Sequence, residues 1–242
     1  MNTHDPAVRP SLTAALAVRR IGTWSFTVPS AMLLLGAAFG AIPETVEIPL
    51  DAASWRILAY SNRPANELRF GDGMTINVSG SASPVVYALP SPLRVGTVHL
   101  RATIDGDVAL DGRVQGGPGA DDFLLRLGLV YEGEQRLGFV QRRLAAPWVR
   151  ELHALAPPDT GISRVEFLNI HSDPRIAGLQ RDHPLASILK ERFILERPAD
   201  GRIDVSFPVP TDARVLAVWL SADGDDTGSA FSVTLHRIAV SP

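Results

Sequence analysis

Short apolar runs broken by turn residues constrain the fold of this chain more than any other feature. In VHLRATI (residues 98–104) apolar residues alternate with polar ones, and RIDVSFPV (residues 202–209) shows the same alternation. A period of two with one apolar face is typical of a half-buried β-strand. FLLRLGLVY (residues 123–131) and VLAVWL (residues 215–220) are apolar at nearly every position, which predicts central strands that are buried on both faces.

Other runs of the same kind extend this pattern along the chain. Further strands are expected at residues 55–60, 74–78, 85–89, 164–170, 193–196 and 231–240. Gly, Pro, Asp and Asn separate the runs at close spacing, which is typical of a sandwich or barrel. In the last run the apolar positions change face near His236 and Arg237, and this change predicts a β-bulge. The expected fold class is therefore all-β, a jelly roll or β-sandwich over residues 54–242.

Two segments depart from the strand pattern. Residues 143–155 (RLAAPWVRELHAL) predict a short helix that begins at Pro147, because proline suits the first turn of a helix. Residues 184–192 (PLASILKER) predict one or two further helical turns.

An uncharged run, IGTWSFTVPSAMLLLGAAFGA at residues 21–41, precedes the predicted sandwich. As a helix it would be roughly 31 Å long, about the thickness of a bilayer core. Arginines precede the run and acidic residues follow it. The positive-inside rule then places residues 1–20 in the bacterial cytoplasm, and residues 42–53 become a linker to a periplasmic domain.

The same run has two interpretations. As a transmembrane helix in the inner membrane, it places Trp24 at the cytoplasmic interface, and Gly36 and Gly40 offer a small-residue face to another helix. The chain would then be an accessory subunit, with the lipid bilayer and the other subunits of a respiratory or photosynthetic complex as partners. As a cleaved signal peptide, with Ala38-Phe39-Gly40 as its cleavage site, it would release an exported soluble module.

Composition and motifs exclude several classes of function. The formal charge is −3, and no basic stretch of the kind expected for nucleic-acid binding is present. The chain has no cysteine, so disulfides and thiolate metal sites are excluded. It contains neither a GxSxG elbow nor an HExxH motif, and we expect no enzymatic activity.

Three aspartates lie close together in SADGDDTGSA (residues 221–230), namely Asp223, Asp225 and Asp226. Calcium takes six to eight oxygen ligands, and closely spaced aspartates beside glycine can supply several of them. However, Asp and Gly are also the common residues of a connection between two strands. A turn, a calcium site and a loop that contacts a ligand are therefore all consistent with this segment, and calcium is the one cofactor that the sequence suggests.

Other polar residues fall in or beside predicted strands. Asp121 and Asp122 precede a strand that contains Arg126. An arginine in an apolar strand needs a carboxylate partner, so we expect a structural ion pair of Arg126 with Asp122 or with an aspartate of the 223–226 segment.

A second polar group lies between residues 169 and 184. His171, Asp173, Asp182 and His183 match no metal-binding spacing, and we interpret them as polar loop residues.

Two longer motifs are similar to a known family. GADDFLLRLGLVYEG (residues 119–133) and LAVWLSADGDDTGSAFSVTLHRIAV (residues 216–240) resemble the bacterial family called domain of unknown function 3047, in order and spacing along roughly residues 54–240. The resemblance implies an exported, galactose-binding-like jelly roll with carbohydrate as its partner and no established activity. It supports the alternative function, a carbohydrate- or surface-binding module.

Overall fold

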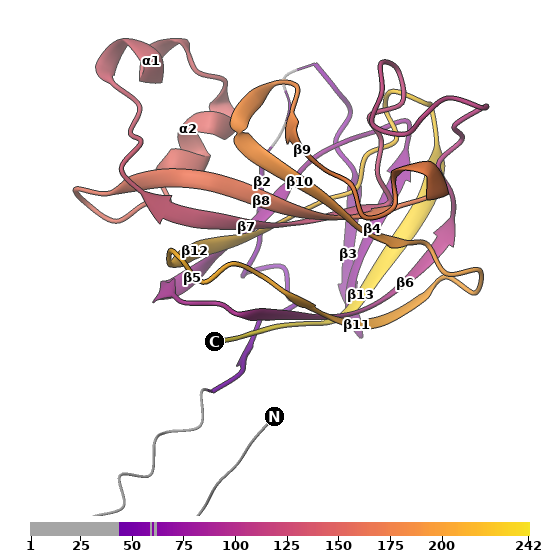
Figure 1. Ribbon diagram of the computed structural model, residues 1–242, viewed down its shortest axis with the longest axis horizontal. Coiled ribbons are helices and arrows are strands. Elements are labelled where there is room, and N and C mark those ends of the chain that lie inside the picture. Colours follow the sequence, from indigo (N-terminus) through magenta and orange to yellow (C-terminus); the bar gives the residue numbers. More distant parts are fainter. Residues whose placement is uncertain (1–43, 59, 61) are drawn as a thin grey trace, which may run out of the picture. The chain divides into compact units, whose positions relative to one another are not determined.

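The computed structural model describes residues 44–58, 60 and 62–242, which form two β-sheets packed face to face (Figure 1). Within these residues the six-stranded sheet contains, in order, β11 (Arg202–Pro208), β6 (Thr97–Gly106), β13 (Ala230–Ser241), β4 (Gly73–Ser79) and β3 (Glu67–Gly71), with β1 (Val46–Glu47) also paired to β13. The seven-stranded sheet contains β2 (Arg56–Ile57), β5 (Val85–Leu93), β12 (Val215–Ser221), β7 (Leu125–Gly133), β8 (Gly161–His171), β10 (Ala186–Glu196) and β9 (Gln180–His183). The predicted all-β sandwich is confirmed.

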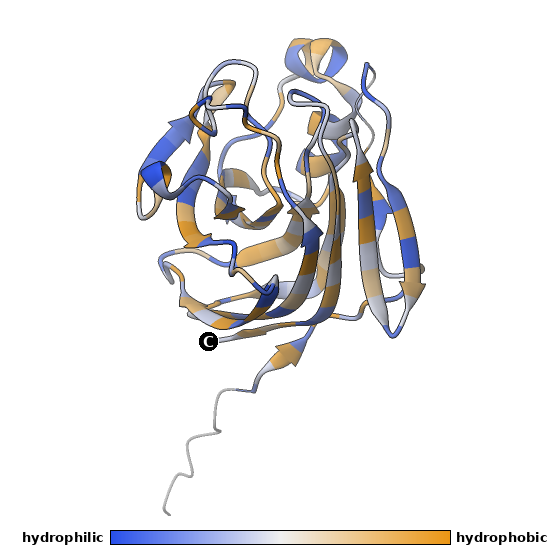
Figure 2. Ribbon diagram, turned by 90° about the vertical axis from the view of Figure 1, so that its right-hand side faces the viewer, coloured by the Kyte–Doolittle hydropathy of each residue, from blue (hydrophilic) through white to orange (hydrophobic). Residues whose placement is uncertain are grey.

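The alternation of polar and apolar residues determines which face of each strand enters the core. In β6, Val98, Leu100, Ala102 and Ile104 are buried between the sheets, and the residues between them are more exposed. Figure 2 shows this alternation as orange and blue bands along the strands. β12 is buried at every position, and β7 at all but its last two residues, as their continuous apolar sequences predict.

A second apolar layer lies on the face of the seven-stranded sheet that points away from the core. It includes Val130 of β7, Phe167 of β8 and Trp219 of β12. Between β7 and β8 the chain forms α1 (Phe139–Leu144) and α2 (Pro147–His153), and Leu152 of α2 packs on this layer. α2 begins at Pro147, as predicted from the sequence.

One prediction about secondary structure is wrong. Residues 184–192 do not form helical turns, because most of this segment belongs to β10, which pairs in parallel with β8. Leu189, Glu191 and Phe193 of β10 are buried at every second position, so sheet pairing overrides local helix propensity here. The expected linker contains β1, which pairs with the end of β13, and Ile48 after it is buried.

The predicted bulge is confirmed. The pairing of β13 with β6 shifts register between Leu235 and Arg237, where the apolar positions change face. β3, β9 and the short 3-10 helix η1 (Pro174–Ile176) were not expected from the sequence.

The predicted transmembrane segment, residues 21–41 with Trp24, Gly36 and Gly40, lies outside the described residues, as does the tail of residues 1–20. In the part of the chain that the structure describes, no helix has the length and apolar character needed to cross a membrane.

Candidate functional site

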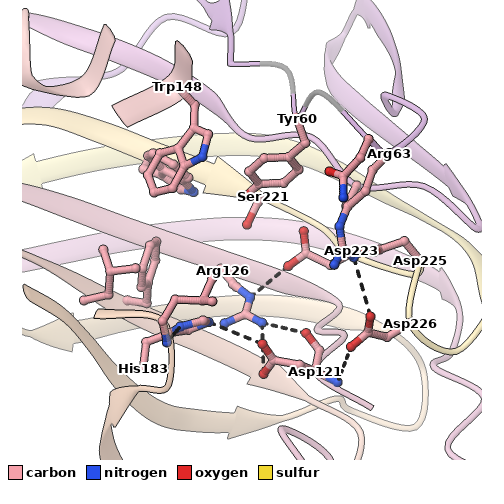
Figure 3. Close-up of a pocket in the computed structure, with 16 residues that line it drawn as sticks. Tyr60, Arg63, Asp121, Arg126, Trp148, His183, Ser221, Asp223, Asp225 and Asp226 are labelled. Carbon is pink, nitrogen blue, oxygen red and sulfur yellow. Dashed lines mark hydrogen bonds and ion pairs between the residues drawn. The ribbon is translucent and has the colours of Figure 1, made fainter. Parts of the chain in front are cut away.

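A pocket of about 300 Å³ lies on the outer face of the seven-stranded sheet, beside α2 (Figure 3). Strands β7, β8, β9, β10 and β12 contribute side chains to it, together with α2, the segment that follows β2 and the β12–β13 loop. Its lining is aromatic on one side and charged on the other. Most ligand pockets combine apolar surface with a few polar groups in this way.

Four aromatic rings form the apolar side of the pocket. Trp219 contacts Phe167 edge to face at a centroid distance of 5.8 Å, and Trp148 of α2 contacts Trp219 at 5.9 Å. Tyr60 completes the series, with its ring 6.2 Å from that of Trp148. Trp219 is 3% exposed, whereas Trp148 and Tyr60 are half-buried. A ligand would therefore meet Trp148 and Tyr60, and the more deeply buried Trp219 packs against Trp148.

A glycine in β7 makes room for these rings. Gly128 lies in register between Trp219 of β12 and Phe167 of β8. A Cβ atom at Gly128 would lie 2.8 Å from the Phe167 ring and 3.1 Å from Cβ of Trp219. A side chain here would push the two rings apart, so this glycine allows their close approach across the strand.

Arg126 of β7 is the centre of the charged side. Its Nε donates a hydrogen bond of 2.8 Å to Asp223, and its other nitrogens bind Glu191 and the backbone oxygen of Asp121. The guanidinium also lies over the Phe123 ring at 4.2 Å. The Arg126 side chain is 7% exposed and that of Asp223 is 11% exposed. Buried ion pairs of this kind require several hydrogen bonds to offset the loss of hydration.

A second arginine links the same carboxylates from the edge of the sheet. Arg181 of β9 donates to Glu191 at 2.6 Å and to Asp121 at 2.9 Å, and His183 Nε2 lies 3.3 Å from Asp121. Asp121, His183 and Glu191 each place one potential ligand atom within 4.8 Å of the others, a spacing suitable for a metal ion. Because Arg126 and Arg181 both bind Glu191 and Asp121, a metal would have to displace these guanidinium groups.

Asp122 organises the β12–β13 loop that closes the pocket. Its carboxylate accepts hydrogen bonds from the backbone nitrogens of Asp226 and Thr227, at 3.2 and 2.7 Å, and from the Thr227 hydroxyl at 2.6 Å. In the same loop Asp225 and Asp226 both face Arg63, with Asp226 at 3.5 Å. The three aspartates that the sequence suggested as calcium ligands are thus each paired with an arginine.

Burial and charge shift the acidity of the pocket carboxyls in opposite directions. Burial raises the pKa of Asp223 to about 6, although Arg126 opposes this shift. Burial also acts to raise the pKa of Asp121, but the hydrogen bond from His183 and the charges of Arg126 and Arg181 outweigh it and hold that pKa below its usual value. At neutral pH the network therefore holds ionised carboxylates beside its arginines.

The structure brings together some of the residues that the sequence singled out and separates others. Arg126 pairs with Asp223, one of its two expected partners, and does not pair with Asp122. Of the polar group in residues 169–184, only His183 lines the pocket.

The other members of that group lie elsewhere. Asp173 accepts a hydrogen bond from the backbone nitrogen of Arg175 at the start of η1, and Asp182 pairs with Lys190 at the surface. His171 is fully buried at the end of β8. Sequence reasoning missed Tyr60, Arg63, Trp148 and Trp219 as site residues. A signal existed for Trp219, because it stands just before the aspartate-rich loop.

No family model and no curated protein matches the chain. Among solved structures, the fold is similar to a xylan-binding module, CBM15, with a TM-score of 0.35 and 13% identity over 82% of this chain and 96% of that one. It is also similar to a family 11 carbohydrate-binding module from Clostridium thermocellum, solved with a β-1,3-1,4-mixed-linked tetrasaccharide, with a TM-score of 0.39 and 7% identity over 83% and 96% of the two chains. At these values neither likeness assigns a ligand to the pocket.

Proposed function

We propose that this protein is a carbohydrate-binding module and that the pocket beside α2 holds a sugar residue. One observation carries the proposal: half-buried aromatic rings and a set of charged hydrogen-bonding groups face the same small cavity. A sugar ring presents C–H groups that pack on aromatic faces, and hydroxyls that bind carboxylates and arginines. Trp148 and Tyr60 supply the aromatic side, and Asp226 and Arg63 supply exposed polar groups.

The residues of the pocket favour binding without bond cleavage. Glycoside hydrolysis uses two carboxyl groups, one as an acid and one as a base or nucleophile. Asp223 and Asp121 have pKa values shifted in opposite directions, as such a pair would require. However, both carboxylates contact Arg126, and protonation of Asp223 would break its ion pair. We therefore assign these carboxylates to holding the site in shape.

The location of the module stays a prediction from residues 21–41. We propose that the sandwich is periplasmic or exported, because that apolar run fits either an inner-membrane anchor or a signal peptide. Sequencing the mature amino terminus and washing membranes with carbonate would distinguish the two forms. A mature chain that begins near Ala41 and leaves the membrane would contradict the anchor and the role as a subunit of a membrane complex.

Binding to a glycan array, followed by calorimetry with the best oligosaccharide, tests the function. We expect Trp148→Ala to weaken binding by about tenfold, since one aromatic face is worth up to about 1.5 kcal/mol. Trp148→Phe, which keeps a ring, should retain most of the affinity. Phe139→Ala is the matched control, because Phe139 of α1 is 82% exposed and lies outside the pocket.

Three results would count against the proposal. Binding to no glycan on the array would contradict carbohydrate recognition, and equal affinity of Trp148→Ala and wild type would move the site elsewhere. Release of new reducing ends from a bound oligosaccharide would show that the carboxylates catalyse cleavage. Circular dichroism of each variant separates loss of binding from loss of fold.

A further inference from the structure

We propose that the sugar recognised by this pocket carries a protonated amino group, as a hexosamine does. The inference rests on the proposed function and names the ligand class for the same site. It starts from the charges that line the pocket. Four carboxylates and two arginines line it: Asp121, Asp223, Asp225, Asp226, Arg63 and Arg126. Their formal charges leave an excess of two negative charges facing the cavity.

The arginines of the pocket already have carboxylate partners. Arg126 binds Asp223 and Glu191, and it lies 3.5 Å from the carboxylate of Asp121. Arg63 faces both Asp225 and Asp226. Neither guanidinium is thus open to a carboxylate, phosphate or sulfate on a ligand. An anionic sugar would have to displace one of these pairs and would then face the remaining carboxylates.

Two side chains inside the pocket have raised pKa values, and burial is the largest cause of both. Burial raises the pKa of Tyr60, and the charge of Asp223 raises it further, against the opposing charges of Arg126 and Arg63. For Asp223, the charge and hydrogen bond of Arg126 lower the pKa by more than the charges of Asp122 and Asp121 raise it, so burial accounts for the net increase. The charge of Asp223 thus acts on Tyr60, which lies on the aromatic side of the pocket.

The aromatic rings favour the same charge. A cation close to the face of a tryptophan or tyrosine ring is attracted by about 0.5–2 kcal/mol, depending on its hydration. Trp148 and Tyr60 are half-buried, and their rings meet edge to face. Asp226 has 30% of its side chain exposed and offers an oxygen to an ammonium group. An ammonium group in this position would meet aromatic faces and the partly exposed carboxylate of Asp226, and it would share that carboxylate with Arg63.

Calorimetry on the full chain in detergent tests the inference with matched sugars. The probes are oligosaccharides of one length and linkage that carry a free amine, an N-acetyl group, a hydroxyl or a carboxylate, in gluco and galacto configurations. We expect the free amine to bind at least about fivefold more tightly than its N-acetyl form, and the uronic acid to bind most weakly. The preference should shrink as salt is raised from 0.05 to 0.5 M, because salt screens exposed charges.

Variants that remove one carboxylate charge show which residue gives the preference for the amine. Asp226→Asn should reduce the preference for the amine over the N-acetyl form by about two- to fivefold. Asp225→Asn provides a second test if Asp226→Asn does not fold. Asp72→Asn removes one negative charge from an exposed position outside the pocket and should change nothing.

The possible results separate the inference from the function on which it rests. Equal affinity for amine and N-acetyl sugars, or tightest binding of the uronic acid, would overturn the inference and leave carbohydrate binding in place. Absence of binding to every probe and to the glycan array would overturn both. A preference for the amine that survives in both Asp226→Asn and Asp225→Asn would also contradict the assignment, because the charge would then lie elsewhere.

Discussion

Arg126 shows how one buried residue can determine the geometry of a binding site. It extends from the middle of the seven-stranded sheet and reaches Asp223, Glu191 and the backbone of Asp121, which lie on three different segments. Removing one member of a buried ion pair usually destabilises a protein by about 3–5 kcal/mol, since the other charge is left without a partner. The charged side of the pocket is therefore rigid, and a ligand meets carboxylates that are already in position.

The raised pKa of Asp223 predicts a pH dependence of stability. Its pKa is about 6 in the folded protein and 3.8 as an ordinary value, so the folded state binds an extra proton between these limits. Stability attributable to Asp223 must then fall as pH rises from about 4 to 6, by at most about 3 kcal/mol. Urea denaturation across this range measures the free energy of unfolding as a function of pH. In Asp223→Asn, the decrease between pH 4 and 6 should be missing.

Asp173 provides the opposite case in a different pH window. Its hydrogen bond from Arg175 lowers its pKa to about 2, so its contribution is present above pH 3.8 and is lost as pH falls towards 2. Asp173→Asn should change the pH dependence of the free energy of unfolding below pH 4 only.

For the first of these two predictions, an unchanged pH dependence of the free energy of unfolding between pH 4 and 6 in Asp223→Asn would show that Asp223 is not the group that titrates there.

At the scale of elements, the β12–β13 loop crosses from the seven-stranded sheet to the six-stranded sheet and forms one wall of the pocket. Asp122 fixes its backbone through Asp226 and Thr227, and Ser229 donates a backbone hydrogen bond of 2.9 Å to Gly224. These bonds come from the protein itself. They define the path of the loop.

We expect millimolar calcium to leave the melting midpoint of the protein unchanged. Each aspartate of the loop is paired with an arginine, Asp223 with Arg126, and Asp225 and Asp226 with Arg63. A calcium ion would have to compete with both guanidinium groups. Differential scanning calorimetry with calcium and with a chelator measures this, since an ion that binds only the folded state must raise the midpoint. A clear increase that Asp225→Asn abolishes would establish the calcium site.

Local patterns predicted the elements of this fold well where the signal itself is local. The alternation in β6, the continuous apolar run of β12, the bulge near Arg237 and the helix start at Pro147 all follow from neighbouring residues. Only the end of β10, residues 193–196, was predicted as a strand. Its first part was missed because the parallel pairing with β8 depends on a distant strand, and the sequence of residues 184–192 alone favours a helix.

The site was harder to predict than the fold for the same physical reason. The need of Arg126 for a carboxylate is visible in the sequence, but the partner, Asp223, is 97 residues away. Trp148 comes from a helix, Trp219 from a strand and Tyr60 from the segment after β2, and only the packing of α2 on the sheet brings their rings together. No spacing rule connects such residues.

At the scale of the whole molecule, the two sheets have different tasks. The six-stranded sheet covers one side of the core, and its other face is more polar. The seven-stranded sheet buries apolar residues on both faces, because it closes the core on one side and carries α2 on the other, where the charged groups of the pocket also lie. Central strands β7 and β12 serve both layers, which explains their continuous burial. A change in either strand should therefore affect both stability and binding.

The boundary of the folded unit gives the last prediction. Val46 and Glu47 pair with the end of β13, Ile48 is 3% exposed, and its backbone nitrogen donates a 2.9 Å bond to Ile238. A chain that begins at residue 44 should thus be more stable than one that begins at residue 54, by about 3 kcal/mol or more. Chemical denaturation of the two forms measures this difference. Ile48→Ala in the longer form should reproduce most of it, because burial of that side chain is the largest single contribution. Equal stability of the two forms would mean that the sandwich begins after residue 53 and that β1 adds nothing to it.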